Sequence, residues 1–243
     1  MSLALVLVEP AGPLNVGSVA RLCANFGIDQ LRLVAPRCDH LGEEARRMAV
    51  HGGGLLEQAQ LFDNLAAALA DCRRVVATSG RIEQEALPLA AADQALAWLR
   101  EGSQTTDMAA LVFGREDRGL SNDELRQAGR VVRLSTAPAY SSLNLSHAVA
   151  ICLHELQRLE EHPVAAPACH QASEPSPRAA LEAGLADAEA LLLEVGFLYP
   201  HTAHARMAKL RALLQRAQVT DDEVALLRGM VRQLRWAAQR RTP

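Results

Sequence analysis

Apolar residues fall into two patterns along the chain, and the first pattern occupies the N-terminal 160 residues. Short, mostly apolar runs rich in leucine and valine lie at 3–8, 31–35, 74–78, 109–113 and 130–134. Their length and β-branched content predict strands, and their continuous hydrophobicity predicts a parallel sheet buried on both faces. Helical patterns and glycines separate them. This part of the sequence therefore predicts an α/β domain.

The second pattern is helical and continues to the C-terminus. One buried helix stripe is predicted by the spacing of Leu145, Val149, Cys152, Leu156 and Leu159. Further helices are expected at 178–195, 202–217 and 221–240. Two capping boxes mark helix starts, SNDE at 121–124 and TDDE at 220–223.

A proline-rich stretch divides the two patterns. Residues 162–178 contain four prolines and no periodicity, which is typical of an extended linker. We therefore expect an α/β domain at 1–161, a linker at 162–178 and a small α-helical extension at 179–243.

Charge differs between the two ends of the chain. The formal net charge is −3, but residues 199–243 hold nine basic side chains against three acids. A basic tail on an acidic body predicts a docking surface for a polyanion, with a solvated helix face as the alternative reading. Arg228, Arg232 and Arg235 border the apolar stripe of the last helix and predict a basic edge there.

Several functional classes are disfavoured by composition. Lys209 is the only lysine among 25 basic residues and lies outside any glycine loop, which argues against a Walker-type site, a kinase lysine or a Schiff base. Five scattered cysteines without a CxxC pair, and histidines without a ligand set, predict neither disulfides nor a metal. The short apolar run at the N-terminus predicts no signal peptide and no membrane span, so a cytoplasmic location is expected.

Three polar segments stand where predicted strands end. They are PLNVGSVARLCANFG at 13–27, VFGREDRGLSNDE at 112–124 and SSLNLSHAV at 141–149. The first is expected to be a loop carrying Asn15, followed by a helix that begins near Gly17. Ligands of open parallel sheets bind beyond the carboxyl ends of the strands. Turn geometry and helix capping would explain each segment taken singly.

Taken together and in this order, the segments resemble a known family. PLNVGSVAR, FGREDRGLSNDEL and YSSLNLSHAVAICLHEL resemble motifs one, two and three of the SPOUT class of S-adenosylmethionine-dependent RNA 2'-O-ribose methyltransferases. Within the TrmH group, the chain is most similar to bacterial TrmJ-type enzymes, which methylate the ribose of cytidine or uridine 32 in the tRNA anticodon loop. LVEP, VVATS, LLRGM and the tail GFLYPHTAHARMAKLRALLQRA extend the resemblance over almost the whole chain.

The resemblance implies a SPOUT fold, a partner and a site. The fold is a parallel α/β sheet with a C-terminal trefoil knot, and the protein would be a homodimer with its active site at the subunit interface. The implied catalytic residues are Asn15, Arg21, Glu116, Ser142 and Asn144. The implied S-adenosylmethionine-binding residues are Thr78, Ser79, Gly80, Gly114, Leu134, Ser141, Ser142 and Leu143. No metal is implied.

Arg21 needs a role that an arginine can perform. Its guanidinium does not give up a proton, so binding of a phosphate and stabilisation of the developing alkoxide are expected rather than base catalysis. Asn15 and Arg21 would reach one site from the start of the same helix. The protein body is acidic, so we expect RNA contacts at Arg21, Arg81, Arg115 and Arg118 and on the C-terminal helices.

Three hypotheses stay open from the sequence. The first is a tRNA ribose methyltransferase, the second is a non-catalytic RNA-binding homodimer of the same fold, and the third is a ribosomal RNA 2'-O-methyltransferase. The joint presence of the five implied catalytic residues favours an enzyme, because a binding module needs no such set. The TrmJ-like tail favours tRNA.

Overall fold

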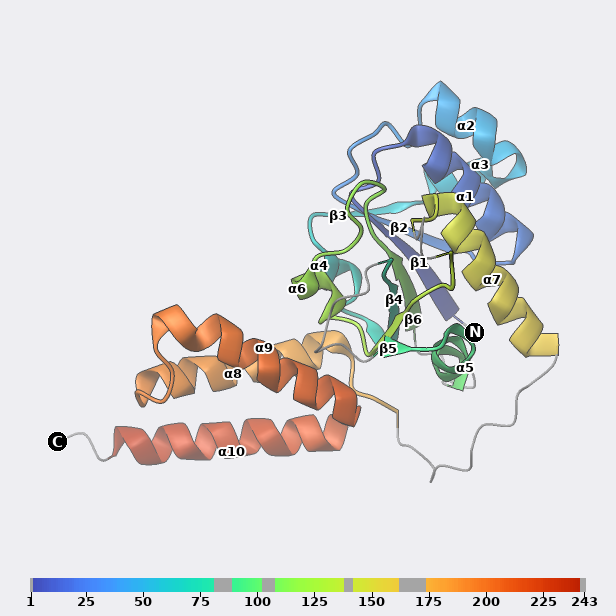
Figure 1. Cartoon of the computed structure of the whole chain (residues 1–243). Coiled ribbons are helices and arrows are strands. Elements are labelled where there is room, and N and C mark those ends of the chain that lie inside the picture. Colours follow the sequence, from blue (N-terminus) through green and yellow to red (C-terminus); the bar gives the residue numbers. More distant parts are fainter. Residues whose placement is uncertain (1, 81–88, 102–107, 138–141, 162–173, 241–243) are drawn as a thin grey trace. The chain divides into compact units, whose positions relative to one another are not determined.

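The chain forms two compact units in the computed structural model (Figure 1). They are Met1–His170, called the sheet unit below, and Gln171–Pro243, called the helical unit. The structure describes residues 2–80, 89–101, 108–137, 142–161 and 174–240.

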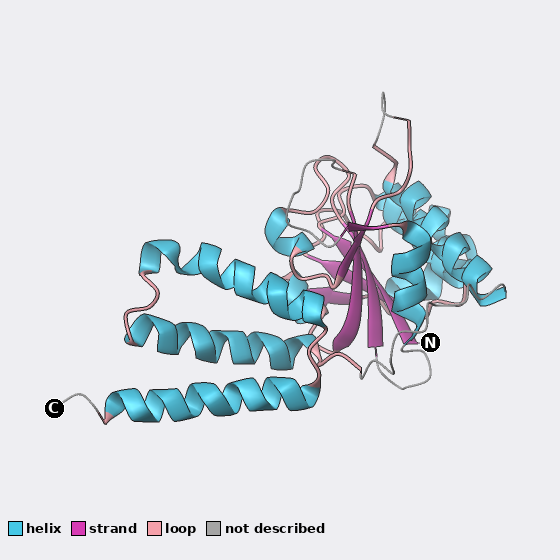
Figure 2. Cartoon of the chain, turned by 60° about the horizontal axis from the view of Figure 1, so that its bottom comes forward, coloured by secondary structure: helices cyan, strands magenta, loops and turns pink. Residues whose placement is uncertain are grey.

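The sheet unit is built on one seven-stranded sheet in the order β3-β2-β1-β6-β4-β7-β5 (Figure 2). The strands are β1 (Ser2–Val8), β2 (Gln30–Val34), β3 (Gln60–Phe62), β4 (Cys72–Thr78), β5 (Leu89–Ala90), β6 (Met108–Phe113) and β7 (Arg130–Val132). Every ladder between these strands is parallel. The predicted α/β parallel sheet is confirmed. Sequence reasoning missed β3 and β5, the two edge strands, whose exposed and half-buried residues give no continuous apolar run.

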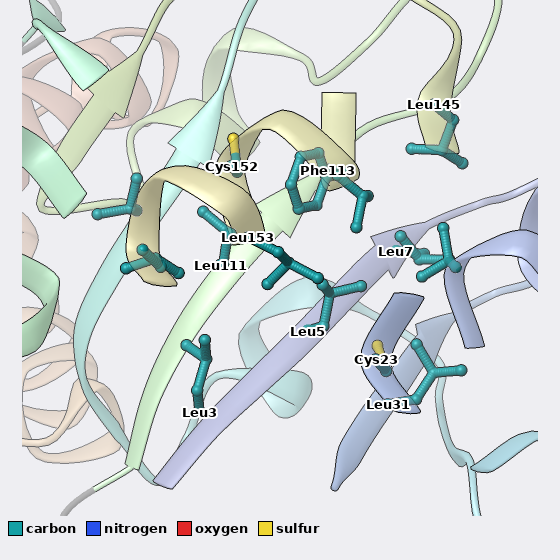
Figure 3. Packing of buried hydrophobic residues seen from close by; sticks show 14 of the residues in the cluster. Leu3, Leu5, Leu7, Cys23, Leu31, Leu111, Phe113, Leu145, Cys152 and Leu153 are labelled. Atoms are coloured by element: carbon teal, nitrogen blue, oxygen red, sulfur yellow. The ribbon is translucent and has the colours of Figure 1, made fainter. Parts of the chain in front are cut away.

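Helices cover both faces of this sheet, because alternate strand residues point to opposite sides. Leu3, Leu5 and Leu7 of β1 join a core with the helices on one face, while Val6 and Val8 join a second core (Figure 3). The first core includes residues of α1 (Pro13–Asn25), α2 (Glu43–Ala49), α3 (Gly53–Glu57), α5 (Ala92–Glu101) and α7 (Leu145–Glu161). The second includes residues of α4 (Leu65–Ala68) and α6 (Asn122–Leu125), and a short 3-10 helix, η1 (Val50–Gly52), joins α2 to α3.

Helix α1 begins earlier than the sequence predicted. It starts at Pro13, a residue that suits the first helical turn because its missing N–H would have no partner there. Asn15 therefore lies in the first turn of the helix and not in a loop. Gly17 lies inside the helix, and a Cβ added there would meet the backbone oxygen of Ala45 at 2.2 Å. Its role is to let α1 and α2 approach closely.

The parallel arrangement decides where the polar segments meet. Val8, Thr78, Phe113 and Val132 end four strands whose ladders all run in the same direction. The chain that follows each strand therefore emerges at one edge of the sheet. The strand order also inserts β7 between β4 and β5, which both precede it in the chain. The trefoil knot stays a prediction.

The helical unit contains α8 (Arg178–Glu194), α9 (Pro200–Ala217) and α10 (Asp221–Gln239), close to the predicted ranges. Leu181, Leu185, Leu198 and Met207 pack in its small core. The predicted capping box at Thr220 is present at the start of α10, as is the one that opens α6. None of the described helices is both long and apolar enough to span a membrane.

The basic edge expected on α10 is only partly free for a partner. Arg228 forms an ion pair with Asp187 of α8 at 3.2 Å, and Arg235 pairs with Glu194 of α8 at 3.7 Å. Arg232 is exposed. Two of the three arginines thus face acidic side chains of their own unit, because amphipathic spacing places them along the α8–α10 contact.

Candidate active site

A cavity lies at the sheet edge where the strands end, with a volume of about 330 Å³. Seven of the eight residues implied to bind S-adenosylmethionine line it, namely Thr78, Ser79, Gly80, Gly114, Leu134, Ser142 and Leu143. The eighth, Ser141, lies outside the described residues. The structure thus brings together segments that follow β4, β6 and β7, although they are far apart in the sequence.

Glycine is required in the loop after β6 because two stretches of backbone cross there. A Cβ added to Gly114 would lie 2.3 Å from the carbonyl carbon of Gly119 and 2.4 Å from the amide nitrogen of Leu120. Gly119 itself has a φ of +68°, a backbone conformation that side chains disfavour. The loop from Gly114 to Gly119 therefore folds back on itself and forms a compact wall of the cavity.

A second, outer cavity of about 680 Å³ adjoins the first. Asn15, Glu116, Ser142 and Asn144, four of the five implied catalytic residues, line it. Glu116 and Ser142 also line the first cavity, together with two leucines. These two polar side chains therefore stand at the junction between the two spaces.

A chain of hydrogen bonds connects the three motifs. The Asn15 Nδ2 donates to Glu116 Oε1 at 3.1 Å, and the Asn144 Nδ2 donates to Asn15 Oδ1 at 3.0 Å. Asn144 Oδ1 then accepts from the backbone N–H of Ser146 at 2.9 Å and of His147 at 3.4 Å. The Asn144 side chain therefore caps α7, as expected for a residue of this type before a helix.

The direction of this chain is fixed by its first member. An ionised carboxylate can only accept, so Glu116 requires the Nδ2 group of Asn15 to face it. Asn15 Oδ1 then points to Asn144, which must present its own Nδ2. The remaining oxygen of Asn144 faces the N-terminus of α7, where free N–H groups need an acceptor. One carboxylate thus orients two amides.

Glu116 is held in its ionised form by these neighbours. Burial alone would raise the pKa of its carboxyl, but hydrogen bonds from Ala11, from its own backbone and from Asn15 and Gly12 outweigh burial and lower the pKa. The Ala11 and Gly12 amides lie 3.1 and 3.0 Å from the carboxylate oxygens. A charged, fully bonded Glu116 is therefore better suited to positioning than to accepting a proton.

The neighbouring Arg115 fastens the same loop to the end of β1. Its guanidinium donates to both oxygens of Glu124 at 2.9 Å and also pairs with Glu9. The Arg115 hydrogen bond, followed by the charges of Arg115, Arg37 and Arg118, lowers the pKa of Glu9 to about 2 despite opposing desolvation. With only 10% of its side chain exposed, Arg115 braces the loop, and its expected contact with RNA stays a prediction.

Sequence reasoning missed this brace. Glu9 belongs to the stretch LVEP and Glu124 ends the capping box SNDE, and neither motif predicts an ion pair with Arg115. Glu124 performs both tasks, since its carboxylate also accepts the N–H of Ser121 at 2.7 Å. An acid directly after β1 and an arginine two residues after β6 are the sequence signal, and the pairing of β1 with β6 brings them to the same edge of the sheet.

Arg21 is the implied catalytic residue that does not join the others. It is exposed on α1, and it lines neither of the two cavities described above. Six residues after Asn15, it lies about 9 Å further along the helix, at about 1.5 Å per residue, and on a different side. The expectation that Asn15 and Arg21 reach one site therefore stays a prediction.

The inner cavity has the chemistry that a nucleoside-containing cofactor requires. Its walls combine the glycine-rich loop, where backbone groups are accessible, with apolar side chains such as Leu134, Leu143 and Leu145. Its volume lies at the lower end of the range for small-molecule pockets, roughly 300–1,000 Å³. The residues present therefore fit S-adenosylmethionine, and none of the described residues forms a cluster that could hold a metal.

Family comparisons agree with this geometry. The SpoU rRNA Methylase family matches residues 2–154, and the C-terminal domain of the tRNA methyltransferase TrmJ matches residues 180–243. The tRNA (cytidine/uridine-2'-O-)-methyltransferase TrmJ of Cronobacter sakazakii is 36% identical over 93% of each chain. A Pseudomonas aeruginosa TrmJ, named for cytidine, uridine and adenosine, is 31% identical over 93% of this chain and 91% of its own.

Structural similarity extends over both units. The crystal structure of TrmJ from Z. mobilis ZM4 matches 95% of this chain and 98% of its own, with 31% identity and a TM-score of 0.81. One family model thus matches most of the sheet unit, and the other matches most of the helical unit. The chain therefore belongs to the SpoU methylase family and, within it, to the TrmJ family.

Proposed function

We propose that this protein is an S-adenosylmethionine-dependent tRNA 2'-O-ribose methyltransferase that acts on nucleotide 32 of the anticodon loop. The observation that carries the proposal is the hydrogen-bonded series Glu116, Asn15 and Asn144 at the mouth of a glycine-walled cavity. The names of the TrmJ relatives support the reaction and the substrate class.

In this proposal, each of the two cavities binds one of the two reactants. The inner one takes S-adenosylmethionine, which supplies an electrophilic methyl group, and the outer one takes the target nucleotide. Ser142 and Glu116 line both, so they stand where the ribose hydroxyl would meet the methyl group. In-line displacement depends on alignment of the two reactants, and rigidly held side chains provide it.

Each polar residue of the site has a role set by its bonding. Glu116 orients Asn15 and keeps the loop after β6 against the start of α1. Asn144 fixes the start of α7, which directly follows Ser142 and Leu143 in the chain. Ser142 lines both cavities, and its hydroxyl would hold the ribose oxygen during methyl transfer.

A homodimer completes the site. Arg21 is exposed on α1 and does not line the outer cavity of its own subunit, so we propose that the partner subunit's Arg21 reaches that cavity across the interface. A guanidinium there would bind the phosphate next to the target ribose and stabilise the developing alkoxide. We also propose that residues 1–161 form the methyltransferase domain, residues 162–178 the linker and residues 179–243 the helical extension.

The test is nucleoside mass spectrometry of undermodified tRNA after incubation with the protein and S-adenosylmethionine. Methylated cytidine or uridine that maps to position 32 in nuclease fragments is the expected result. Ribosomal RNA in a parallel reaction tests the alternative that the SpoU family description raises. Absence of methylation on both RNAs, with S-adenosylmethionine bound normally, would leave the non-catalytic hypothesis instead.

Arg21→Ala tests the role of the arginine. We expect this variant to lose methylation while its affinity for S-adenosylmethionine, measured by calorimetry, stays the same. Arg47→Ala is the matched control, because Arg47 is also an exposed helical arginine, 72% exposed, and it pairs with Glu43 on its own helix. Near-normal turnover by Arg21→Ala would contradict the assignment.

A further inference from the structure

Exposed aromatic rings are concentrated in one unit of this protein. Among the described residues, the exposed rings are Phe197, Tyr199 and Trp236, with 61%, 56% and 49% of their surface accessible. All three belong to the helical unit, whereas Phe113 and Trp98 of the sheet unit are buried. Aromatic residues make up only 3% of the sequence. Leaving three large rings in water forfeits the stabilisation that burial would bring.

The turn between α8 and α9 holds two of these rings outward. Gly196 ends α8 with a φ of +74°, and the amides of Phe197 and Leu198 both donate to the Leu192 carbonyl oxygen at 2.9 Å. Leu198 is 2% exposed and packs in the core of the unit. With this anchor fixed between them, Phe197 and Tyr199 project into solvent. Backbone geometry, not side-chain freedom, sets their positions.

Each exposed ring has a nitrogen-bearing side chain against it. The pairs are the Arg206 guanidinium 5.8 Å from the Phe197 ring centre, the Arg240 guanidinium 3.9 Å from the Trp236 ring centre, and the His201 ring 5.9 Å from the Tyr199 ring at an interplanar angle of 21°. Arg206 also donates to the Phe197 carbonyl oxygen at 3.0 Å. A guanidinium is attracted to the face of an aromatic ring, and each of the three residues still keeps 49% or more of its surface accessible.

The three rings lie at the same end of the helical unit. Gln239 in the last turn of α10 donates to Glu194 at the end of α8 at 3.5 Å, and Arg235 pairs with the same carboxylate. Both views show the α8–α9 turn and the C-terminal end of α10 at one end of the three helices (Figures 1 and 2). Trp236, on the last turns of α10, therefore shares an end with Phe197.

Phosphate attraction by the basic residues of the unit is weakened by internal pairing. Arg211 forms two hydrogen bonds of 2.8 Å with Glu182, and Arg228 pairs with Asp187. These arginines neutralise acids of α8. Part of the positive charge of this unit is therefore neutralised within the unit.

We propose that this end of the helical unit, formed by Phe197, Tyr199 and Trp236, is a stacking surface for unpaired nucleobases of RNA. Proteins that recognise unpaired RNA stack its bases on aromatic side chains and on arginine planes, and nearby cations contact the backbone. The proposal rests on the proposed function, since the RNA would be the tRNA substrate. It adds the chemistry by which the helical unit would bind that substrate.

Substitution at the turn tests the proposal in the full-length protein. Phe197→Leu and Tyr199→Leu keep an apolar side chain but remove the aromatic face. Each is expected to weaken tRNA binding, measured by fluorescence anisotropy, by about 5- to 150-fold, the range that loss of one base–aromatic stack corresponds to. The slope of log affinity against log salt should stay unchanged, because no phosphate contact is lost.

Matched controls separate stacking from packing and from charge. Phe197→Tyr and Tyr199→Phe retain a ring and should bind tRNA as the parent does. Leu213→Ala removes an exposed apolar side chain, 49% accessible, from α9 and should have no effect. A perfectly paired RNA duplex offers no unpaired base. It should bind more weakly than tRNA does, and its affinity should be the same for the parent and all variants.

The outcomes distinguish this proposal from the proposed function. In methylation assays, the leucine variants should raise KM for tRNA and leave kcat and S-adenosylmethionine affinity unchanged. Normal KM in both leucine variants of an active enzyme would overturn the stacking surface alone. A change of oligomeric mass with unchanged RNA affinity would instead assign the rings to a protein contact and overturn it too. A parent protein that methylates no tRNA would overturn the proposed function.

Discussion

Asn15→Asp is the most informative change in the candidate site, because it is nearly isosteric and replaces one hydrogen-bond donor by a carboxylate oxygen. Asn15 Nδ2 now donates to Glu116 Oε1 at 3.1 Å, while Asn15 Oδ1 accepts from Asn144. An aspartate would keep the acceptor and place a second carboxylate against Glu116. The site would then contain two carboxyl groups at hydrogen-bond distance.

The distance sets the size of the effect. Two unit charges about 3.1 Å apart repel by at most ~5 kcal/mol at an effective dielectric constant of ~20. Such a pair cannot hold two charges near neutral pH, so one of the two pKa values should rise by about 2 units or more. The single proton would then bridge the carboxyls and replace the lost N–H donor. The bridged form exists below the raised pKa and is lost as the pH rises through it.

Methylation measured against pH tests this reasoning. We expect the activity of Asn15→Asp relative to the parent to be within about 10-fold at pH ~5.5, and to fall by a further factor of about 100 by pH ~8.5 as the bridging proton leaves. Asn15→Ala has no carboxyl and should show an equal loss at both values. The reasoning is refuted if Asn15→Asp follows the parent at every pH, or if it parallels Asn15→Ala.

Three further changes probe the frame of the site. Gly114→Ala places a Cβ about 2.3 Å from the Gly119 backbone, so calorimetry should detect much weaker S-adenosylmethionine binding, and unchanged affinity would contradict the loop crossing. Glu9→Gln removes a carboxylate with a pKa of about 2 that pairs with Arg115. Because that pKa is depressed, the ionised Glu9 should stabilise the folded state by about 1 kcal/mol after solvent screening. Urea unfolding at pH 7 should show this difference in unfolding free energy between the parent and Glu9→Gln, and the difference should vanish as the pH falls from 4.5 towards 2. A difference that does not change with pH would refute this assignment. Asn144→Ala removes the cap of α7 and should lower the free energy of unfolding by about 1 kcal/mol. An unfolding midpoint equal to that of the parent would contradict this expectation.

Much of the fold could be predicted because the relevant signals are local. The buried strands gave continuous apolar runs, and α7 gave a clear helical stripe, since burial of one face constrains every third or fourth residue. Strands β3 and β5 lie at the two edges of the sheet, and their residues are exposed or only half-buried, so burial imposes no continuous apolar run on them. The start of α1 was misplaced because Gly17 looked like a turn residue, whereas its missing side chain serves the contact with Ala45.

In the candidate site, too, local motifs could be predicted from the sequence and contacts between distant segments could not. The three motifs identified Asn15, Glu116 and Asn144, because their order in the chain resembles a known family. Which atoms they present to one another depends on the carboxylate of Glu116 and on the free amides at the start of α7. The bracing of the loop by Arg115 joins groups separated by 106 residues, beyond any local signal.

The sequence by itself determined the parallel α/β sheet, the helical extension and the residues of the three motifs, because hydrophobic periodicity and short-range motifs are written in neighbouring positions. Only the tertiary structure decided that Arg21 does not line the cavity that Asn15 lines, that Arg115 is an internal brace and that α10 turns two of its arginines towards α8. The physical reason is that a charge acts on whatever lies within a few ångströms of it, and the packing of distant segments decides what that is.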